Sequence, residues 1–369
     1  MNAPGPVRVA VVGLGWAARE IWLRRLHDHP AFEVVAVIDP NAAARGAARV
    51  RYPGIAVLGT AGELDPSTLD LAVVAVPNHL HGEVAEGLLK HGLAVFVEKP
   101  VCLTSAEARR LAEAERAGGG VLLAGSAARL RADVRALYAA VRDIGPIRHI
   151  EASWVRARGV PAAGGWFTHR ELAGGGALLD LGWHLFDVAA PLLGPATFDQ
   201  VAGAFSADFV ASGEAAAGWR QDGATGDGAV DVEDTARAFL VTHDQVSVAL
   251  RTSWASHEPF DVTSFVIEGR SGKAALRCTF GFSPQREGSS RLVVTRYGEA
   301  VTQPLPEEPI GVEYDRQLDD LLTRLRDPAG RGAAAEETLR TIHVIEHLYA
   351  SARPSTSVRW AGTADVVRR

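Results

Sequence analysis

Short apolar runs alternate with helical patterns through the first third of the chain. The runs are rich in Val and end at turns that contain Gly, Pro, Asp or Asn, as expected of strands covered on both faces. Between them, apolar residues recur at the spacing of amphipathic helices. The alternation predicts a doubly wound parallel sheet. The expected strands are Val7–Val12, Glu33–Ile38, Ala56–Leu58, Leu71–Val76, Ala94–Val97 and Val121–Ala124, and the expected helices lie near 16–29, 41–51, 79–91 and 104–117.

The pattern changes after Arg129. Longer strand-like runs separated by turn residues extend from about 197 to 297, which predicts a large, mostly antiparallel open sheet. A chain of 369 residues suits two domains. We therefore expect an α/β protein divided at 1–127 and 128–369, with helices at 312–350 packing back on the first domain. The other elements expected after Arg129 are a strand near 147–156 and helices near 130–143 and 175–193.

The segment 211–230 is rich in Gly, Ala and Asp and has no apolar period, which predicts a surface loop. From Asp208 to Asp234 there are seven acids (Asp208, Glu214, Asp222, Asp227, Asp231, Glu233, Asp234) against one base, Arg220. Two interpretations stay open: a site that attracts a cationic substrate such as an aminosugar, or a solvated loop.

Charge and composition exclude several classes of partner. The net charge is −6, which disfavours nucleic acid and anionic membranes. No run approaches the ~18 apolar residues that span a bilayer, and Val7–Val12 leads into a glycine turn rather than a cleavage site. Cys102 and Cys278 lack a pairing or metal pattern and are expected to be packed thiols. We expect a cytoplasmic protein without a metal.

A glycine turn between the first strand and the first helix predicts a bound dinucleotide. Gly13 permits the tight turn, Gly15 lets the backbone approach a pyrophosphate, and Ala18 keeps the helix close to the strand. The free amides at the start of the helix, at Trp16 and Ala17, would then face the phosphates.

Asp39 ends the second strand, where an acid accepts hydrogen bonds from the adenosine ribose. A 2′-phosphate there would meet a like charge, at a cost of about 4 kcal/mol for a ~4 Å pair. The sequence therefore favours NAD over NADP, although Arg45 could soften this preference. The alternative is that Asp39 is a turn residue before Pro40.

Two further strands end in polar residues. Pro77, Asn78 and His81 follow the fourth strand and are expected to line the cofactor near its ribose or nicotinamide; the rival interpretation, a metal site at His79 and His81, lacks a third ligand. Glu98-Lys99-Pro100 follows the fifth strand. Lys99 is placed to hydrogen-bond a reacting oxygen and stabilise charge that develops on it. The alternative is a structural Glu98–Lys99 ion pair at a hinge.

A third constellation follows a run of glycines. Gly174-Gly175-Gly176 precedes Asp180 and His184, which are four residues apart and share one helix face. The acid would fix the imidazole tautomer while the other ring nitrogen takes a proton. The glycines would allow close contact with a ligand. A purely structural hydrogen bond between Asp180 and His184 is the alternative.

In this order, these motifs resemble the glucose–fructose oxidoreductase, inositol dehydrogenase and rhizopine-catabolism (Gfo/Idh/MocA) family. The resemblance implies a Rossmann domain followed by an α/β domain whose open sheet forms a homodimer or homotetramer. It implies Lys99 as the catalytic lysine, Asp180 as a supporting acid, His184 as the general acid/base and Trp166 as an aromatic that reaches the cofactor. The cofactor-binding set is Gly13, Gly15, Trp16, Ala17, Asp39, Pro77, Asn78, His81, Glu98, Lys99, Pro100 and Trp166.

The function implied by this resemblance is hydride transfer between NAD(P) and a secondary alcohol or ketone of a sugar, aminosugar or cyclitol. Two alternatives remain at this point. One is an NAD-dependent glycosidase that oxidises its substrate transiently and then eliminates. The other is a nucleotide-binding regulator without catalytic activity, which the presence of both Lys99 and His184 disfavours.

Overall fold

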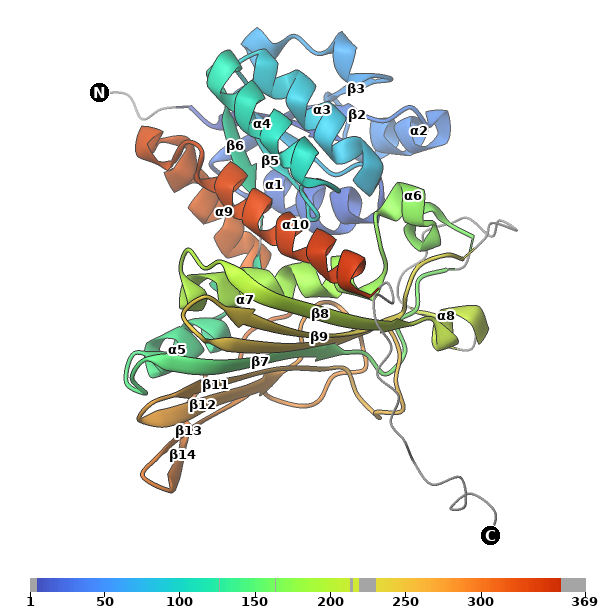
Figure 1. Ribbon diagram of the computed structural model, residues 1–369. Helices are drawn as coiled ribbons and strands as arrows, with labels where there is room; N and C mark the ends of the chain where they lie inside the picture. The colour runs from blue at the N-terminus through green and yellow to red at the C-terminus, as the bar shows by residue number, and fades with distance from the viewer. Residues whose placement is uncertain (1–4, 126, 163, 213–214, 219–229, 353–369) are drawn as a thin grey trace.

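The computed structural model describes residues 5–125, 127–162, 164–212, 215–218 and 230–352. Two sheets form the molecule, one from the N-terminal third of the chain and one from the remainder (Figure 1). This architecture confirms the expected α/β class, with a parallel sheet followed by a mostly antiparallel one.

The first sheet has six parallel strands in the order β3-β2-β1-β4-β5-β6. The strand order reverses between β1 and β4, and this is the point where doubly wound sheets bind ligands beyond their strand C-termini. Most strand bounds agree with the sequence prediction. The exceptions are β2, which starts one residue earlier, and β4, which ends at Val74. The strands are β1 (Val7–Val12), β2 (Phe32–Ile38), β3 (Ala56–Leu58), β4 (Leu71–Val74), β5 (Ala94–Val97) and β6 (Val121–Ala124).

Helices cover both faces of this sheet. The first begins as a π-helix, η1, and continues as α1; π turns of this kind often occur at functional sites. Thr104 caps α4 by accepting from the Glu107 amide at 3.1 Å, and Gly119 ends the helix in the left-handed region at φ 72°. The helices are η1 (Ala17–Leu23), α1 (Arg24–Asp28), α2 (Ala42–Arg51), α3 (Asn78–Lys90) and α4 (Ser105–Gly118), with short turns η2 (Ala61–Glu63) and η3 (Pro66–Thr68).

The second sheet has eight strands in the order β14-β13-β12-β11-β7-β10-β9-β8. Only β7 and β10 pair in parallel within it, and the other neighbours are antiparallel. Gly269 pairs with Gly272 at the tip of the β11–β12 hairpin, so Arg270 and Ser271 form its turn. The strands are β7 (Ile147–Val155), β8 (Phe198–Ser206), β9 (Thr235–Thr242), β10 (Ser247–Ser253), β11 (Val262–Gly269), β12 (Gly272–Cys278), β13 (Arg291–Arg296) and β14 (Glu299–Gln303).

Burial alternates along the central strands of this sheet. On β9, Ala236, Ala238 and Leu240 are buried, whereas Arg237 and Phe239 are exposed. One face therefore packs on helices and the other is open, as in antiparallel sheets with one solvated face. The helices and turns of this part are η4 (Ala127–Leu130), α5 (Ala132–Val141), η5 (Trp166–Thr168), α6 (Arg170–Ala173), η6 (Leu178–Gly182), α7 (Trp183–Leu193) and α8 (Asp208–Ser212).

The last helices join the two sheets. α9 (Val312–Leu325) packs on η4, and after the turn η7 (Pro328–Gly330), α10 (Ala333–Ser351) packs on both α4 and β8. Figure 1 shows α10 running between the upper and lower halves of the molecule. Glu346 of α10 accepts a hydrogen bond from the Ser105 amide at 2.9 Å. These contacts fix the second sheet relative to the first.

Among the described residues, one helical stretch, 170–193, is long and apolar enough by length and composition to cross a membrane. Of its most apolar window, 67% is buried inside the protein, as in the core helix of a globular protein. Both cysteines are buried, and burial raises the pKa of each thiol above its usual range. The two thiols are thus packed core groups, as expected.

Candidate active site between the two sheets

A cavity of about 370 Å³ lies beyond the C-terminal ends of β1, β2, β4 and β5, where the first sheet meets β7 and the η6–α7 helix. The sequence predicted fourteen site residues, and every one except Pro100 lines this cavity. Pro100 is buried behind it, after a cis peptide bond to Lys99. Segments far apart in the chain therefore converge on one cavity.

The glycine turn forms the floor of the cavity. Gly13 has a φ of +96°, and a Cβ there would lie 2.5 Å from the Ala75 carbonyl oxygen. The carboxylate of Asp39 accepts hydrogen bonds from the amides of Leu14 at 2.8 Å and Asn41 at 2.7 Å. The acid thus also braces the turn, so the two interpretations of Asp39 are compatible. A glycine-only turn, an acid at the second strand and a cavity between them fit a dinucleotide.

Aromatic rings form the walls. Trp16 lies edge-on to Phe282, with ring centroids 5.7 Å apart, and Phe282 stacks on Tyr314 at 5.5 Å. Trp166 packs edge-on against Phe167 at 4.9 Å. All of these rings line the cavity. They provide flat apolar surfaces of the kind that cofactor sites use.

Asn78 and His81 line the cavity, but their polar atoms are used within the protein. The Asn78 amide donates to the Ala173 carbonyl at 2.9 Å. The ring nitrogens of His81 lie 2.6 Å and 2.8 Å from the carbonyl oxygens of Pro100 and Val76. Burial lowers the pKa of His81. Both side chains therefore brace the loops around the cavity, and His81 is not arranged as a metal ligand.

Glu98 and Lys99 point to different partners. The Glu98 carboxylate accepts from the Trp22 indole at 2.8 Å and from the Lys99 amide at 2.9 Å. The Lys99 ammonium lies 2.5 Å from an oxygen of Asp180. Lys99 thus forms its ion pair with Asp180, an acid from the other half of the chain. This ion pair crosses the cavity between the two sheets.

Asp180 is the centre of the site. Its Oδ1 accepts from Lys99 Nζ at 2.5 Å, and its Oδ2 accepts from the indole Nε1 of Trp254 at 2.9 Å. Arg156 lies 4.0 Å from Oδ2. Because donors engage both oxygens, the carboxylate of Asp180 is positioned to hold Lys99 in place. This differs from the expectation that Asp180 orients His184.

His184 also faces the cavity and packs on Trp154, with ring centroids 5.4 Å apart. The pKa of His184 is lowered from 6.5 to about 3, mainly by burial and also by the Lys99 and Arg156 cations, whereas the Asp180 carboxylate opposes this decrease. Among the described residues, none forms a hydrogen bond with this imidazole. The ring is therefore neutral at physiological pH, and its nitrogens are left for a ligand.

A neutral His184 makes stability depend on pH. Because the folded-state pKa lies below that of the unfolded chain, unfolding takes up a proton between about pH 6.5 and pH 3. The free energy of unfolding should fall by about 1.4 kcal/mol for each pH unit below 6.5. Urea unfolding at pH 7.5 and at pH 4.5 measures how much the free energy of unfolding falls between the two conditions. This fall should be smaller in His184→Asn than in the native chain, by about 2–3 kcal/mol. His243→Asn, at an exposed histidine, is the control; equal losses in all three proteins would contradict the assignment.

The three glycines before Asp180 contact protein atoms rather than open space. Gly174 has a φ of +85°, a Cβ on Gly175 would overlap the Tyr349 hydroxyl, and a Cβ on Gly176 would overlap the Glu233 carbonyl. The Glu233 carboxylate accepts from the Gly176 amide at 3.0 Å and from the Tyr349 hydroxyl at 2.8 Å. The expectation that these glycines allow close contact with a ligand was wrong. They let the start of the η6–α7 helix pack against α10 and against the segment that precedes β9.

Besides the wall rings Phe167, Phe282 and Tyr314, the sequence did not point to three polar or aromatic residues around Asp180 and His184, namely Trp154, Arg156 and Trp254. Trp154 and Arg156 are two apart at the end of β7, so they share one face, and the Arg156 guanidinium lies 5.2 Å from the Trp154 ring. Trp254 is fully buried beneath Asp180. Arg156, a charged residue on the apolar face at the end of a predicted strand, was the feature of the sequence that could have indicated this part of the site.

The acids counted between 208 and 234 are only partly described. Glu214, Asp222 and Asp227 lie outside the described residues. Asp231 accepts from the Arg170 amide at 2.6 Å, and Asp234 accepts from the Phe209 and Val210 amides at 2.7 Å and 2.9 Å. Together with Glu233, these acids hold backbone groups, which favours a structural role over attraction of a cationic substrate.

Comparison with known proteins agrees with this geometry. A family model described as "Oxidoreductase family, NAD-binding Rossmann fold" matches residues 7–126, and one described as "GFO/IDH/MocA C-terminal domain" matches residues 133–275. A solved structure from Desulfitobacterium hafniense, provisionally described as an NADPH-dependent oxidoreductase, superposes with a TM-score of 0.77 at 22% identity, over 96% of this chain and 97% of that one.

Two curated relatives align over nearly the full length. A protein of Amycolatopsis mediterranei, provisionally named the oxidoreductase subunit of UDP-kanosamine synthase, is 57% identical over 346 residues, covering 94% of this chain and 96% of the relative. The dTDP-3,4-didehydro-2,6-dideoxy-alpha-D-glucose 3-reductase of Streptomyces antibioticus is 27% identical over 97% of this chain and 99% of its own length. With both family models matched in order, the chain belongs to the Gfo/Idh/MocA family of NAD(P)-dependent oxidoreductases that act on sugar-like substrates.

Proposed function

We propose that this protein oxidises the C3 hydroxyl of a UDP-hexose, UDP-glucose in the first instance, to the 3-ketone with NAD as the oxidant. The observation that supports this most is the convergence of Lys99, Asp180 and His184 on one cavity beside the glycine turn. The substrate comes from the relatives. Kanosamine is 3-amino-3-deoxyglucose, so its synthesis on a UDP-sugar requires a C3 ketone for amination, and the Streptomyces relative is named for chemistry at position 3.

Each site residue has a role in this proposal. Lys99, held by Asp180, donates a hydrogen bond to the reacting oxygen and stabilises negative charge that develops on it. His184 is neutral and is placed in the cavity to accept the hydroxyl proton. A bound NAD would supply the acceptor for the hydride that leaves the carbinol carbon. Trp154 and Arg156 then contact the neighbouring hydroxyls of the sugar.

The cofactor is proposed to be held by the predicted set. The amides of Trp16 and Ala17 face the pyrophosphate, Asp39 faces the ribose, and the rings of Trp16 and Trp166 flank the cofactor. NAD is preferred because Asp39 supplies a negative charge, and because Arg45 donates to the carbonyls of Asp39 and Pro40, each at 2.8 Å. Those bonds commit one guanidinium nitrogen of Arg45 to the backbone.

Asp39→Asn should therefore change cofactor choice. The amide keeps one acceptor for the Leu14 amide but removes the charge that repels a 2′-phosphate. We expect the ratio of kcat/KM for NAD to that for NADP to fall by about tenfold to a thousandfold, since ~4 kcal/mol is the upper bound for one charge pair. Glu33→Gln, at an exposed acid on the same strand, should leave the ratio unchanged. An unchanged ratio in Asp39→Asn would remove the argument for NAD.

Partners follow from the same comparison. The relative is named as a subunit, so we propose that the ketone passes to a separate aminotransferase.

The open face of the eight-stranded sheet, with Phe239 48% exposed, is proposed to join copies of this chain into a homodimer or homotetramer. Sedimentation equilibrium measures the subunit number directly. Location in the cytoplasm remains a prediction.

The direct test uses UDP-glucose, UDP-N-acetylglucosamine, free glucose, an aminoglycoside sugar and myo-inositol, each with NAD and with hydroxylamine to trap the ketone. We expect NADH formation with UDP-glucose, and a single deuterium at C3 after reduction of the untrapped product with borodeuteride. Deuterium at another carbon would refute the position. Cleavage of the UDP–sugar bond without net NADH would instead identify the glycosidase alternative, and no NADH with any substrate would favour the regulator.

A further inference from the structure

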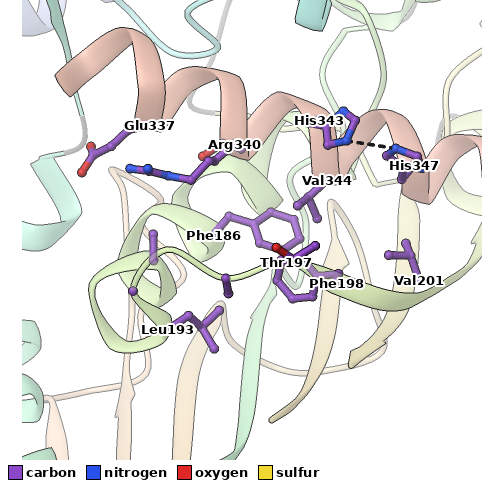
Figure 2. Close-up of a pocket in the computed structure, with 14 residues that line it drawn as sticks. Phe186, Leu193, Thr197, Phe198, Val201, Glu337, Arg340, His343, Val344 and His347 are labelled. Atoms are coloured by element: carbon purple, nitrogen blue, oxygen red, sulfur yellow. Dashed lines mark hydrogen bonds between the residues drawn. The ribbon is translucent and has the colours of Figure 1, made fainter. Parts of the chain in front are cut away.

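Two histidines on the exposed face of α10 lie next to each other, remote from the active-site cavity. His343 and His347 are four residues apart on this 19-residue helix, and both side chains are exposed. They line the rim of a second cavity of about 290 Å³, whose floor includes Phe186, Phe198 and Val344. Figure 2 shows the two rings turned toward one another above this apolar floor. No step of the proposed reaction uses them.

The geometry of the pair matches that of two ligands of one metal ion. The Nε2 atoms are 3.2 Å apart, and the ring planes are inclined at 84°. With metal–nitrogen bonds of about 2.0–2.1 Å, two imidazole nitrogens lie about 3.3 Å apart in tetrahedral coordination and about 2.9 Å apart at a right angle. The i, i+4 spacing of two histidines on one helix face also allows both imidazoles to bind one zinc ion.

Their surroundings leave the pair available. In the described part of the chain, the only hydrogen bond of either imidazole is the one between them. No third His, Cys, Asp or Glu gathers with them among these residues. A metal would therefore have two protein ligands, with water in the remaining positions, and the exposed rim leaves room for that water.

We propose that His343 and His347 form a binding site for a divalent transition metal ion, Zn²⁺, Ni²⁺ or Cu²⁺, through their Nε2 atoms. Both rings must be neutral and carry their proton on Nδ1, so binding releases protons where either ring is charged. From the sequence we expected no metal, since only His79 and His81 suggested a metal site there. The present site lies on a different helix and is independent of the proposed oxidation.

The position of the pair gives the ion a structural consequence. Tyr349 follows His347 by two residues and donates to Glu233 at 2.8 Å, and Glu233 accepts from the amides of Gly176 and Leu178. A metal that links two adjacent turns of α10 stabilises the last part of this helix. It thereby stabilises the anchor of the segment that leads to Asp180 and His184.

The test titrates ZnCl₂, NiCl₂ and CuCl₂ separately into the full chain without an affinity tag, after treatment with EDTA, by isothermal calorimetry. We expect one ion per chain, with affinity in the order Cu²⁺, then Ni²⁺ and Zn²⁺, and nitrogen hyperfine structure in the Cu²⁺ electron paramagnetic resonance spectrum. At a hundredfold excess of metal over Kd, the melting temperature should rise by about 4 °C.

The matched variants are His343→Ala and His347→Ala, each of which should lose the calorimetric signal and the thermal shift. His243→Ala, at an exposed histidine on another element, should retain both. If the native chain binds no metal at micromolar concentration, or if both α10 variants bind as tightly as the native chain, the proposal is wrong. In that case the 3.2 Å contact is a hydrogen bond between two neutral rings. Neither outcome bears on sugar oxidation.

Discussion

Lys99→Met should lower kcat by about a thousandfold, which is the loss expected when one donor to a developing oxyanion is removed. The side chain keeps its approximate length but loses the ammonium that pairs with Asp180 at 2.5 Å. Affinity for NADH should stay within about threefold, because the glycine turn and Asp39 do not depend on this charge. Steady-state kinetics with the UDP-sugar and NADH fluorescence titration measure the two quantities separately.

Two controls separate the role of this amine from general effects of charge. Lys90→Met removes an exposed lysine that pairs with Glu86 on the surface and should leave kcat unchanged. Lys99→Arg retains the charge and should recover part of the rate, although its planar fork does not reproduce an ammonium. A Lys99→Met enzyme with kcat within tenfold of the native value would exclude Lys99 from the reaction.

Gly176→Ala should cost about 3–5 kcal/mol of folding free energy, the range of severe single-site effects. The new methyl group would overlap the backbone carbonyl of Glu233, which cannot move without disturbing β9. The same shift displaces the amides that Glu233 holds at Gly176 and Leu178. Urea unfolding should show the lower stability, and the remaining folded enzyme should have reduced kcat because Asp180 and His184 follow this turn directly.

Gly46→Ala provides the comparison for that variant. Gly46 lies inside α2, and a Cβ there meets nothing within 4 Å. Alanine favours the helix over glycine by about 1 kcal/mol, so this variant should be at least as stable as the native chain. Equal stability of Gly176→Ala and the native protein would show that the packing around Glu233 is loose.

Local patterns were sufficient for the first sheet and for the cofactor turn. Short apolar runs bounded by turn residues mark these strands, so β1, β3, β5 and β6 could be read to the residue. The first strand, the glycines and Asp39 are adjacent in sequence or one strand apart, and the doubly wound topology then places them together. Local sequence patterns were thus enough to predict most of the first sheet and its cofactor turn.

The second half was less accessible because its site depends on contacts between distant residues. Trp254 resembles any buried aromatic until its indole is seen to donate to Asp180, 74 residues earlier in the chain. The glycines at 174–176 suggested a ligand, yet the atoms against them belong to Tyr349 and Glu233. The helical spacing of Asp180 and His184 was correct, but spacing alone could not show that Lys99 and Trp254 would occupy both carboxylate oxygens.

The carboxylate of Asp180 receives one donor from each side: Lys99 follows the last residue of β5 by two positions, and Trp254 follows the last residue of β10 directly. A small outward rotation of either half would separate Lys99 from Asp180 and would withdraw the amine from the substrate oxygen. In the proposed reaction, activity therefore depends on the contact between the two halves of the chain at Asp180. Any ligand that wedges the crevice apart by an ångström or two would act as an inhibitor without touching the cofactor.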